Sequence, residues 1–413
     1  MRSAGEPQNT LYAHRKPLAV VRCASVGDVQ AGLERAARQG IPVAARSGGH
    51  SYAGYSWPDG GLVLDLGGLS HVRVDGRRAT IGAGARMHDV YEALGAAGQA
   101  LPAGSCSTVG IAGLALGGGI SVISRRYGLT CDHLVQARIV TPDGVLRTVS
   151  DESEPDLFWA LKGGGGGNFG VVTEFTFRTD PAPDLVVFGL DYPDGTTADV
   201  LDAWQDWIAD APDELWTSLR VDSGSPSVPS VRGTYAGPAK DLHRLLDRMP
   251  RGAREVEETT YLQAMRHYAG PAETGEPYVA SSRMLHSPVP GSKVAALVDG
   301  QPPCMIQFDS FGGVVGRVAP DATAFPHRDA TASAQVYVHL GDLTEAGARA
   351  LLAGLRDGLG AGTTGYVNYI DPEMPDRVLR PQPEAPQGGR GPVRPRSRAG
   401  VRAGPIAGSR SAR

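Results

Sequence analysis

Three glycine-rich loops constrain the fold of this 413-residue chain more than any other feature. The first has the sequence Arg-Ser-Gly-Gly-His at residues 46–50, the second runs from Cys106 to Gly119, and the third spans Gly163–Gly167. Glycine lets backbone N–H groups approach a ligand closely and form concave anion-binding nests. One such run alone is more often a tight turn. The spacing is not the Gly-x-Gly-x-x-Gly of a dinucleotide-binding Rossmann unit, which disfavours NAD.

Two reactive side chains, His50 and Cys106, lie in the first two loops. The ordinary interpretation is a loop histidine bonded to backbone and a buried thiol, the commoner fates of these residues. A metal site is not expected, because no carboxylate or second histidine stands at ligand spacing beside His50. The other interpretation is a flavin site, because an imidazole and a thiol can bond covalently to the 8α-methyl and C6 positions of an isoalloxazine ring.

Together, these loops resemble the bicovalently flavinylated branch of the berberine-bridge-enzyme-like FAD-linked oxidases, in an actinobacterial-type form. The resemblance runs from about Leu18 to about Asp376 and is tightest between Val43 and Phe177. It implies an α+β fold, with a PCMH-type FAD-binding domain of two α/β subdomains and an α+β substrate domain whose sheet is covered by helices. It also implies FAD held covalently through His50 and Cys106. The implied cofactor contacts are Arg46, Ser47, Gly48, Gly49, His50, Ser51, Cys106, Thr108, Val109, Gly110, Gly113, Gly117, Gly118, Gly170 and Val172.

The run Tyr-Val-Asn-Tyr at residues 366–369 supplies the catalytic candidates, Tyr369 and Tyr366. In carbohydrate oxidases of the resembling family, the tyrosine matching Tyr369 removes the substrate hydroxyl proton. In a strand the two rings would point to opposite faces, whereas a bend would let both face the substrate. A phenol is a weak base at neutral pH and burial weakens it further, so it needs a donor that the sequence does not identify. A strand tyrosine with a satisfied hydroxyl is the alternative. The motif Phe-Pro-His-Arg at 325–328 is expected to be structural, with His327 a weaker candidate base.

The resemblance implies an oxidase that acts on a hydroxylated small molecule, a sugar or a natural product. The carbon-bound hydride would pass to flavin N5, and molecular oxygen would reoxidise the flavin and yield hydrogen peroxide. Val109 matches the family position that controls oxygen access, and valine there is typical of the oxidases. Three alternatives remain open: a dehydrogenase with another electron acceptor, an oxidative-cyclisation enzyme of the same fold, and an inactive, truncated or frameshifted FAD-binding remnant.

The chain length favours two domains, and Pro-Ala-Pro at 181–183 marks a plausible boundary. The resemblance implies that residues 1–180 bind FAD and that residues 181–364 bind the substrate. A return segment, 365–376, leads back to the FAD domain. The strands expected in the first domain are Leu18–Cys23, Ile41–Ala45, Leu62–Leu66, Ala79–Ile81, Leu134–Val140, Val145–Val149 and Val171–Phe177. The strands expected in the second are Leu185–Tyr192, Leu215–Val221, Ser230–Ala236, Met305–Phe308 and Ser333–Leu340. Helices are expected after Ser25 and over Met87–Ala97, Glu154–Leu161, Ala198–Asp210 and Lys240–Met249.

Composition limits the partners. The net charge of −4 gives no reason to expect a nucleic acid, and no apolar run is long enough for a membrane helix. Residues 1–10 lack the apolar core of a signal peptide, so a cytoplasmic protein is expected, with an exported form if the natural N-terminus is longer. Residues 377–413 are rich in Arg, Pro, Gly and Ala, where the resembling family has a segment that completes the FAD domain. An out-of-frame reading of GC-rich DNA is favoured over a genuine disordered basic tail.

Overall fold

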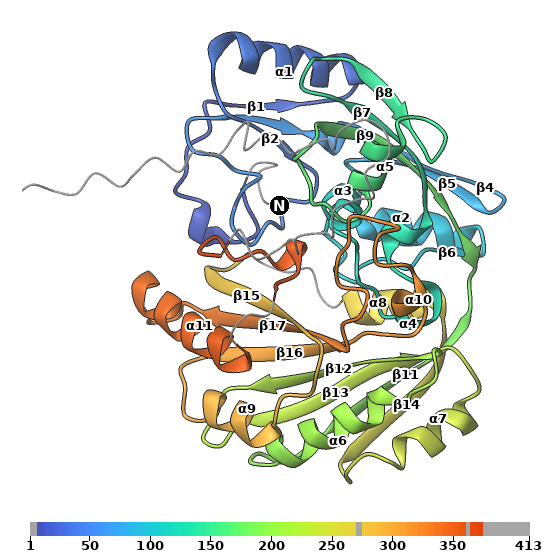
Figure 1. The fold of residues 1–413 in the computed structure, drawn as a ribbon, viewed down its shortest axis with the longest axis vertical. Helices are drawn as coiled ribbons and strands as arrows, with labels where there is room; N and C mark the ends of the chain where they lie inside the picture. Colours follow the sequence, from blue (N-terminus) through green and yellow to red (C-terminus); the bar gives the residue numbers. More distant parts are fainter. Residues whose placement is uncertain (1–5, 270–274, 361–363, 375–413) are drawn as a thin grey trace, which may run out of the picture.

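A computed structural model describes residues 6–269, 275–360 and 364–374 (Figure 1). Within these residues the strands form four sheets, arranged as an upper part built from the first half of the chain and a lower part built from the second. The expected tail at 377–413 and the end of the expected return segment lie outside the described residues. The predicted domain boundaries at 181 and 364 stay predictions.

The first sheet is small and parallel, with the strand order β1-β3-β2. Its strands are β1 (Ala19–Arg22), β2 (Val43–Arg46) and β3 (Leu62–Asp65). Helix α1 (Val26–Gln39) connects β1 to β2 and begins with the predicted capping box, in which Ser25 Oγ accepts from Asp28 N and the Asp28 carboxylate accepts from Ser25 N. Strand β2 ends at Arg46, so the loop that carries His50 begins directly after this strand.

The second sheet has five strands in the order β4-β5-β9-β7-β8. They are β4 (Val72–Asp75), β5 (Arg78–Gly82), β7 (Leu134–Val140), β8 (Leu146–Val149) and β9 (Val171–Arg178). The hairpin predicted around residues 142–144 is confirmed, because β7 and β8 pair antiparallel. The short pieces around this sheet are α2 (Met87–Ala96), α3 (Ile111–Leu116), α4 (Ser124–Tyr127), α5 (Pro155–Leu161), η1 (Thr10–Tyr12), η2 (Leu66–Gly68), η3 (Thr130–His133) and the paired strands β6 (Gln99–Ala100) and β10 (Asp180–Pro181).

The third large element is an antiparallel sheet of seven strands, ordered β14-β11-β13-β12-β16-β17-β15. Its strands are β11 (Asp184–Asp191), β12 (Leu215–Asp222), β13 (Val228–Tyr235), β14 (Ala253–Thr260), β15 (Tyr278–Leu285), β16 (Cys304–Ser310) and β17 (Ala332–His339). Helices α6 (Thr197–Ala209), α7 (Ala239–Leu246), α9 (Gly291–Val298) and α11 (Glu345–Leu359) lie on its outer face (Figure 1). Helices α8 (Tyr261–Ala269) and α10 (Val314–Arg317) lie on the other face, towards the upper part (Figure 1).

Alternation along the strands gives this sheet an apolar face and a polar face. On β16, Ile306 and Phe308 enter the core beneath the outer helices. The intervening Gln307 and Asp309 point to the opposite face, towards the upper part of the molecule. The inner face of the sheet therefore carries polar groups opposite the glycine loops. This is the arrangement expected for a substrate surface.

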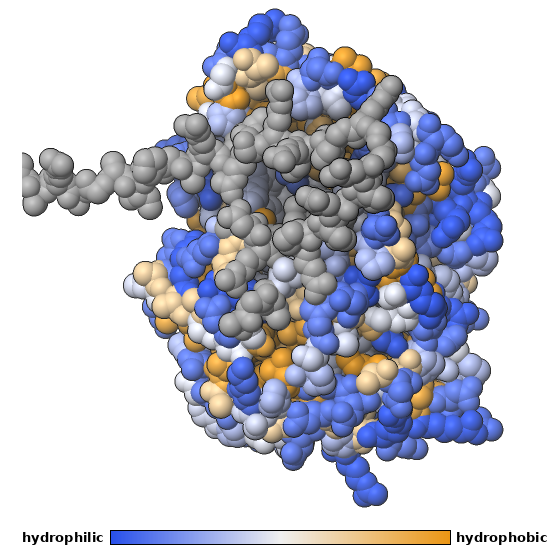
Figure 2. Space-filling model, in the orientation of Figure 1, coloured by the Kyte–Doolittle hydropathy of each residue, from blue (hydrophilic) through white to orange (hydrophobic). Residues whose placement is uncertain are grey.

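The viewed surface is mainly polar, with hydrophobic side chains in small groups (Figure 2). Among the described residues, no helix is both long and apolar enough to cross a bilayer.

Candidate active site

The first two glycine loops are in direct contact with each other. A Cβ atom added at Gly48 would lie 2.2 Å from Gly110 N, and one added at Gly110 would lie 2.0 Å from Ser47 Oγ. Neither position accepts a side chain without moving backbone, so these glycines bring the loops together. Arg86 joins the same two loops, because its guanidinium donates to Gly48 O at 2.9 Å and also to the Thr108 carbonyl oxygen. Sequence analysis missed Arg86, since a single arginine before a helix gives no signal.

His50 faces the second loop and is electrically neutral at physiological pH. Its Nε2 lies 2.9 Å from Thr108 Oγ1, which fixes the orientation of the ring. Burial, together with the nearby charges of Arg86 and Arg46, lowers the pKa of His50 to about 4. A neutral imidazole whose orientation is fixed beside the second loop suits covalent attachment to a flavin better than an ordinary loop histidine.

The remaining predicted residues of the first loop hold its shape. Arg46 donates to Glu6 O at 2.6 Å and lies against Gly49, whose φ is +80°. Ser47 Oγ donates to Ala83 O at 2.6 Å, and Ser51 Oγ accepts from the backbone of the turn that follows. The N–H groups of Gly48 and Gly49 donate to no described residue. The predicted role of these two groups as anion donors therefore stays a prediction that the geometry allows.

The triple-glycine run at 117–119 has a different role from the one predicted. Its three N–H groups are already bonded inside the protein, that of Gly119 to the Tyr366 hydroxyl at 2.9 Å. A Cβ at Gly117 would lie 2.0 Å from Asn368 Oδ1. Asn368 Nδ2 in turn donates to Leu114 O at 3.0 Å. The expectation that these N–H groups face a pyrophosphate is therefore not met, because the run is packed against the segment that carries the catalytic candidates.

Three further predicted cofactor contacts lie in and beside the glycine loops. Gly113 stands on α3 with open space where a side chain would be. Gly170 has a φ of +141°, and a Cβ there would meet Val140 O at 2.4 Å. Val172 pairs with Ile139 in the five-stranded sheet, and its side chain belongs to the core. A cofactor contact at these three residues remains a prediction.

The predicted tyrosine pair lies on a bend, not a strand. Residues Val367–Tyr369 form the 3-10 helix η4, which lets both rings face the same region, 4.9 Å apart between centroids and at 86° to each other. Tyr366 is buried, and its oxygen accepts from Gly119 N and Asn368 Nδ2. The satisfied-hydroxyl alternative therefore describes Tyr366. Tyr369 remains the catalytic candidate, and its ring stacks on Tyr52 at 5.3 Å and 8°.

Asp309 is the principal functional candidate that sequence analysis missed. Its carboxyl group is buried on the inner face of β16, and this burial raises its pKa to about 7, while a hydrogen bond from Gln307 at 3.1 Å acts in the opposite direction. Burial first, and then the charges of Asp309 and Cys106, hold the pKa of Tyr369 well above its usual value. The structure therefore brings the phenol, the carboxyl group and the cysteine tether into one electrostatic neighbourhood. The sequence signal that could have indicated Asp309 is its position two residues after Gln307 in a strand that is otherwise mainly apolar.

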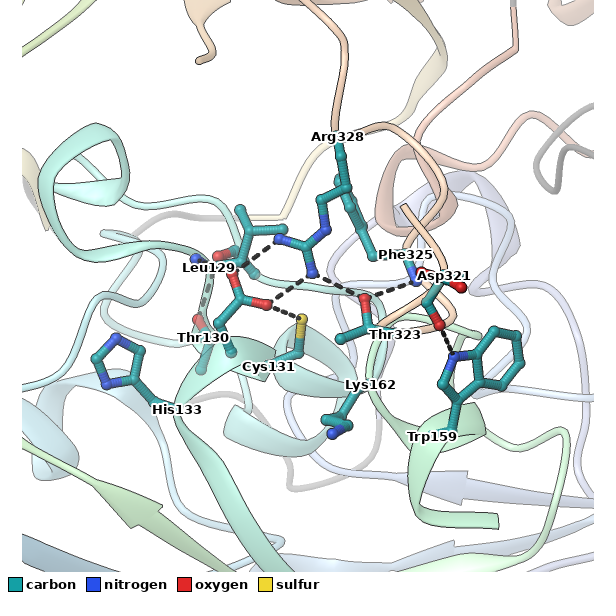
Figure 3. A network of polar contacts seen from close by, with 12 residues as sticks. Leu129, Thr130, Cys131, His133, Trp159, Lys162, Asp321, Thr323, Phe325 and Arg328 are labelled. Carbon is teal, nitrogen blue, oxygen red and sulfur yellow. Dashed lines mark hydrogen bonds and ion pairs between the residues drawn. The ribbon is translucent and has the colours of Figure 1, made fainter. Parts of the chain in front are cut away.

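A loop from the lower part of the molecule docks on the glycine loops (Figure 3). Phe325 packs against two glycines. A Cβ atom added at Gly118 would lie 2.8 Å from the Phe325 ring, and one added at Gly163 would lie 2.5 Å from the Phe325 Cβ. Arg328, which is buried, binds the Asp132 carboxylate through two hydrogen bonds of 2.9 and 2.6 Å. The Phe-Pro-His-Arg motif therefore joins the loop before β17 to the glycine loops and to η3, in agreement with its expected structural role.

The donor set suits a flavin. Among the described residues, no group of three His, Cys, Asp or Glu side chains is placed to hold a metal ion. The site instead combines a neutral imidazole, the half-buried thiol of Cys106 and glycine backbone at closest approach. These groups fit a large planar cofactor that is held covalently and by backbone.

Comparison with known proteins gives the same assignment. Residues 17–150 match the family described as FAD binding domain. The chain is 33% identical over 385 residues to an uncharacterised FAD-linked oxidoreductase of Bacillus subtilis (strain 168), over 88% of this chain and 85% of that protein. Among solved structures, it is similar to Physcomitrella patens BBE-like 1, with a TM-score of 0.85 and 27% identity. The match covers 91% of this chain and 88% of that protein. It is also similar to the glucooligosaccharide oxidase of Acremonium strictum, with a TM-score of 0.79 and 28% identity, over 89% of this chain and 86% of that protein. That enzyme carries a 6-S-cysteinyl, 8α-N1-histidyl FAD.

Proposed function

The chain belongs to the berberine-bridge-enzyme-like FAD-linked oxidases, and on that premise we propose that it oxidises a hydroxyl group of a sugar or of a sugar-like natural product. The observation that carries the proposal is that the charges of Asp309 and Cys106 both act on the buried phenol of Tyr369. A proton-accepting pair thus stands next to one of the two flavin tethers. Similarity to a glucooligosaccharide oxidase supports a carbohydrate as the substrate class.

The flavin is bonded to His50 and Cys106 in this proposal. The His50 ring is neutral at pH 7 and its orientation is fixed beside the second loop, which suits it to form the bond. Cys106 lies in the turn that precedes α3, and Val109 N closes that turn on Cys106 O at 3.2 Å. Two bonds from two loops that contact each other through glycine would fix the ring without using any residue of the substrate sheet.

The protein residues supply proton transfer and orientation. FAD, when bound, supplies the hydride acceptor. Tyr369 takes the hydroxyl proton of the substrate as the carbon-bound hydride leaves, and Asp309 lowers the cost of that step by accepting the proton in turn. A carboxylate with a pKa of about 7 is matched to this task at neutral pH, whereas the phenol alone is not. Asp309 is a proton acceptor and not the donor expected from the sequence, so in this proposal it assists Tyr369 by taking up its proton.

Polar side chains of the inner face are the proposed contacts for substrate hydroxyls. Gln307 lies beside Asp309 on β16 and opposite Gln335 on β17. The amide of Gln335 donates to the Tyr52 hydroxyl, and Tyr52 stacks on Tyr369. Two amides, a carboxyl and an aromatic ring are the groups that bind a sugar through its hydroxyls and its apolar face.

The test is anaerobic stopped-flow reduction of the purified protein by cellobiose, xylobiose, N,N′-diacetylchitobiose and glucose. We expect flavin bleaching by at least one sugar and, on admitting air, reoxidation with one hydrogen peroxide per sugar oxidised. Tyr369→Phe is the matched variant, because it removes the proton acceptor and leaves the tethers in place. Bleaching that is equally fast in Tyr369→Phe would contradict the assigned base. Bleaching without reoxidation by oxygen would identify a dehydrogenase.

A further inference from the structure

A network of four charges, three of them buried and Asp357 exposed, adjoins the segment that carries the tyrosine bend. Arg356 of α11 donates from Nη1 to Asp371 Oδ2 at 2.9 Å, and from Nε and Nη2 to Asp357 at 2.9 and 3.1 Å. Arg283 of β15 donates to the same Asp357 at 3.1 Å. Arg356 and Asp371 are 7% and 5% exposed, so this ion pair is shielded from solvent.

The network ends on the segment that carries the catalytic candidate. Asp371 follows Tyr369 by two residues, and its other carboxylate oxygen accepts from Glu373 N at 2.9 Å. On the near side, Ser282 Oγ donates to Tyr369 O at 3.2 Å and accepts from Tyr366 N at 2.9 Å. The bend is therefore held by hydrogen bonds at its start and by an ion pair at its end. Within the described part of the segment from residue 364 to 371, Asp371 forms the only ion pair.

We propose that Arg356 and Asp371 are positioning residues that hold the phenol of Tyr369 at the reacting hydroxyl. The proposal rests on the proposed function, in which Tyr369 is the proton acceptor. A buried ion pair adds little net stability compared with apolar packing, but it permits one geometry only. Proton and hydride transfer depend on that geometry, because a displacement of about 1 Å can slow a reaction on the order of 100-fold. Arg356 and Asp371 therefore act on rate through Tyr369 without touching substrate.

The experiment is a double-mutant cycle on the flavin-loaded protein. Asp371→Asn keeps the size of the side chain and its acceptor for Glu373 N, but removes the charge that Arg356 binds. We expect roughly a 10- to 100-fold slower flavin reduction at saturating sugar, with the sugar dissociation constant changed by less than about threefold. Combined with Tyr369→Phe, Asp371→Asn is expected to add no further loss, because its effect passes through the phenol. Xylobiose is the probe, at the pH where the unmodified protein is fastest.

Two further variants separate positioning from simple destabilisation. Arg356→Lys keeps the charge and is expected to retain more of the rate than Asp371→Asn. Arg244→Gln is the control: Arg244 lies on α7, another helix on the outer face of the same sheet, and its exposed side chain pairs with Asp241, which shares no partner with Asp371. Its reduction rate, pH profile and covalent flavin content are expected to stay unchanged.

Three outcomes would overturn the proposal. They are an unchanged reduction rate in Asp371→Asn, a loss that is fully additive to that of Tyr369→Phe, and failure of both Asp371→Asn and Arg356→Lys to yield folded protein. The last result would mark the pair as purely structural. A fast Tyr369→Phe variant would instead refute the proposed function, and it is measured separately in the same cycle.

Discussion

Replacement of Asp309 by asparagine is expected to make the protein slower and, at alkaline pH, more stable. The carboxyl group is buried and forms no ion pair with any described residue, and burial raises its pKa from 3.8 to about 7. The shift corresponds to about 4 kcal/mol of unfavourable free energy once the group is ionised in the folded protein, at about 1.4 kcal/mol per pKa unit. Asparagine has the same shape, can still accept from Gln307, and carries no charge to bury.

The sign of the pH dependence follows from proton linkage. Between pH 3.8 and 7 the folded protein keeps a proton on Asp309 that the unfolded chain has already released. The free energy of unfolding therefore falls as the pH rises through this window, and the full cost is present above pH 7. Asp309→Asn has no such dependence. The stability advantage of the variant is expected to grow by about 3 kcal/mol between pH 5 and pH 8.

Denaturant unfolding of both flavin-loaded proteins at pH 5, 6, 7 and 8 measures this difference. Asp222→Asn is the control, because Asp222 lies on the same face of the sheet but is half-exposed and paired with Arg220. The rate of flavin reduction gives the second readout: it is expected to rise with pH through about 7 in the unmodified protein and to lose that rise in Asp309→Asn. A stability difference that is flat or shrinks between pH 5 and 8 would refute the buried-carboxylate reasoning.

Three other predictions concern the cofactor and the base. Tyr369→Phe is expected to slow flavin reduction by about 10²–10⁴-fold while covalent flavin content stays the same, as stopped-flow and the absorbance of acid-precipitated protein will show. Peptide mass spectrometry is expected to find one FAD linking the His50 and Cys106 peptides; unmodified peptides from folded protein would contradict the double tether. Arg86→Gln removes the donor that joins the two loops, so covalent flavin yield is expected to fall in the same absorbance assay, and an unchanged yield would show that glycine contact alone holds the loops.

Local sequence signals predicted much of the fold. The capping box at Ser25, the hairpin after Val140 and most strands of both large sheets are confirmed, within one to three residues at their ends. Strands β4, β14 and β15 and helices α8, α9 and α11 were among the elements missed. The exposed edge strand β14 is rich in glutamate, and α11 contains three glycines, so neither has the composition typical of its structure.

The sequence by itself determined which residues carry the chemistry of the first loops, because His50, Cys106 and their glycines lie in short, distinctive runs. Only the tertiary structure decided how the site is completed. It placed Asp309 near Tyr369, packed the glycine run at 117–119 against the tyrosine bend, and joined Gly119 to Tyr366, 247 residues away. Periodicity and turn signals report on neighbours along the chain, whereas a buried carboxyl acquires its raised pKa from groups that only folding brings around it.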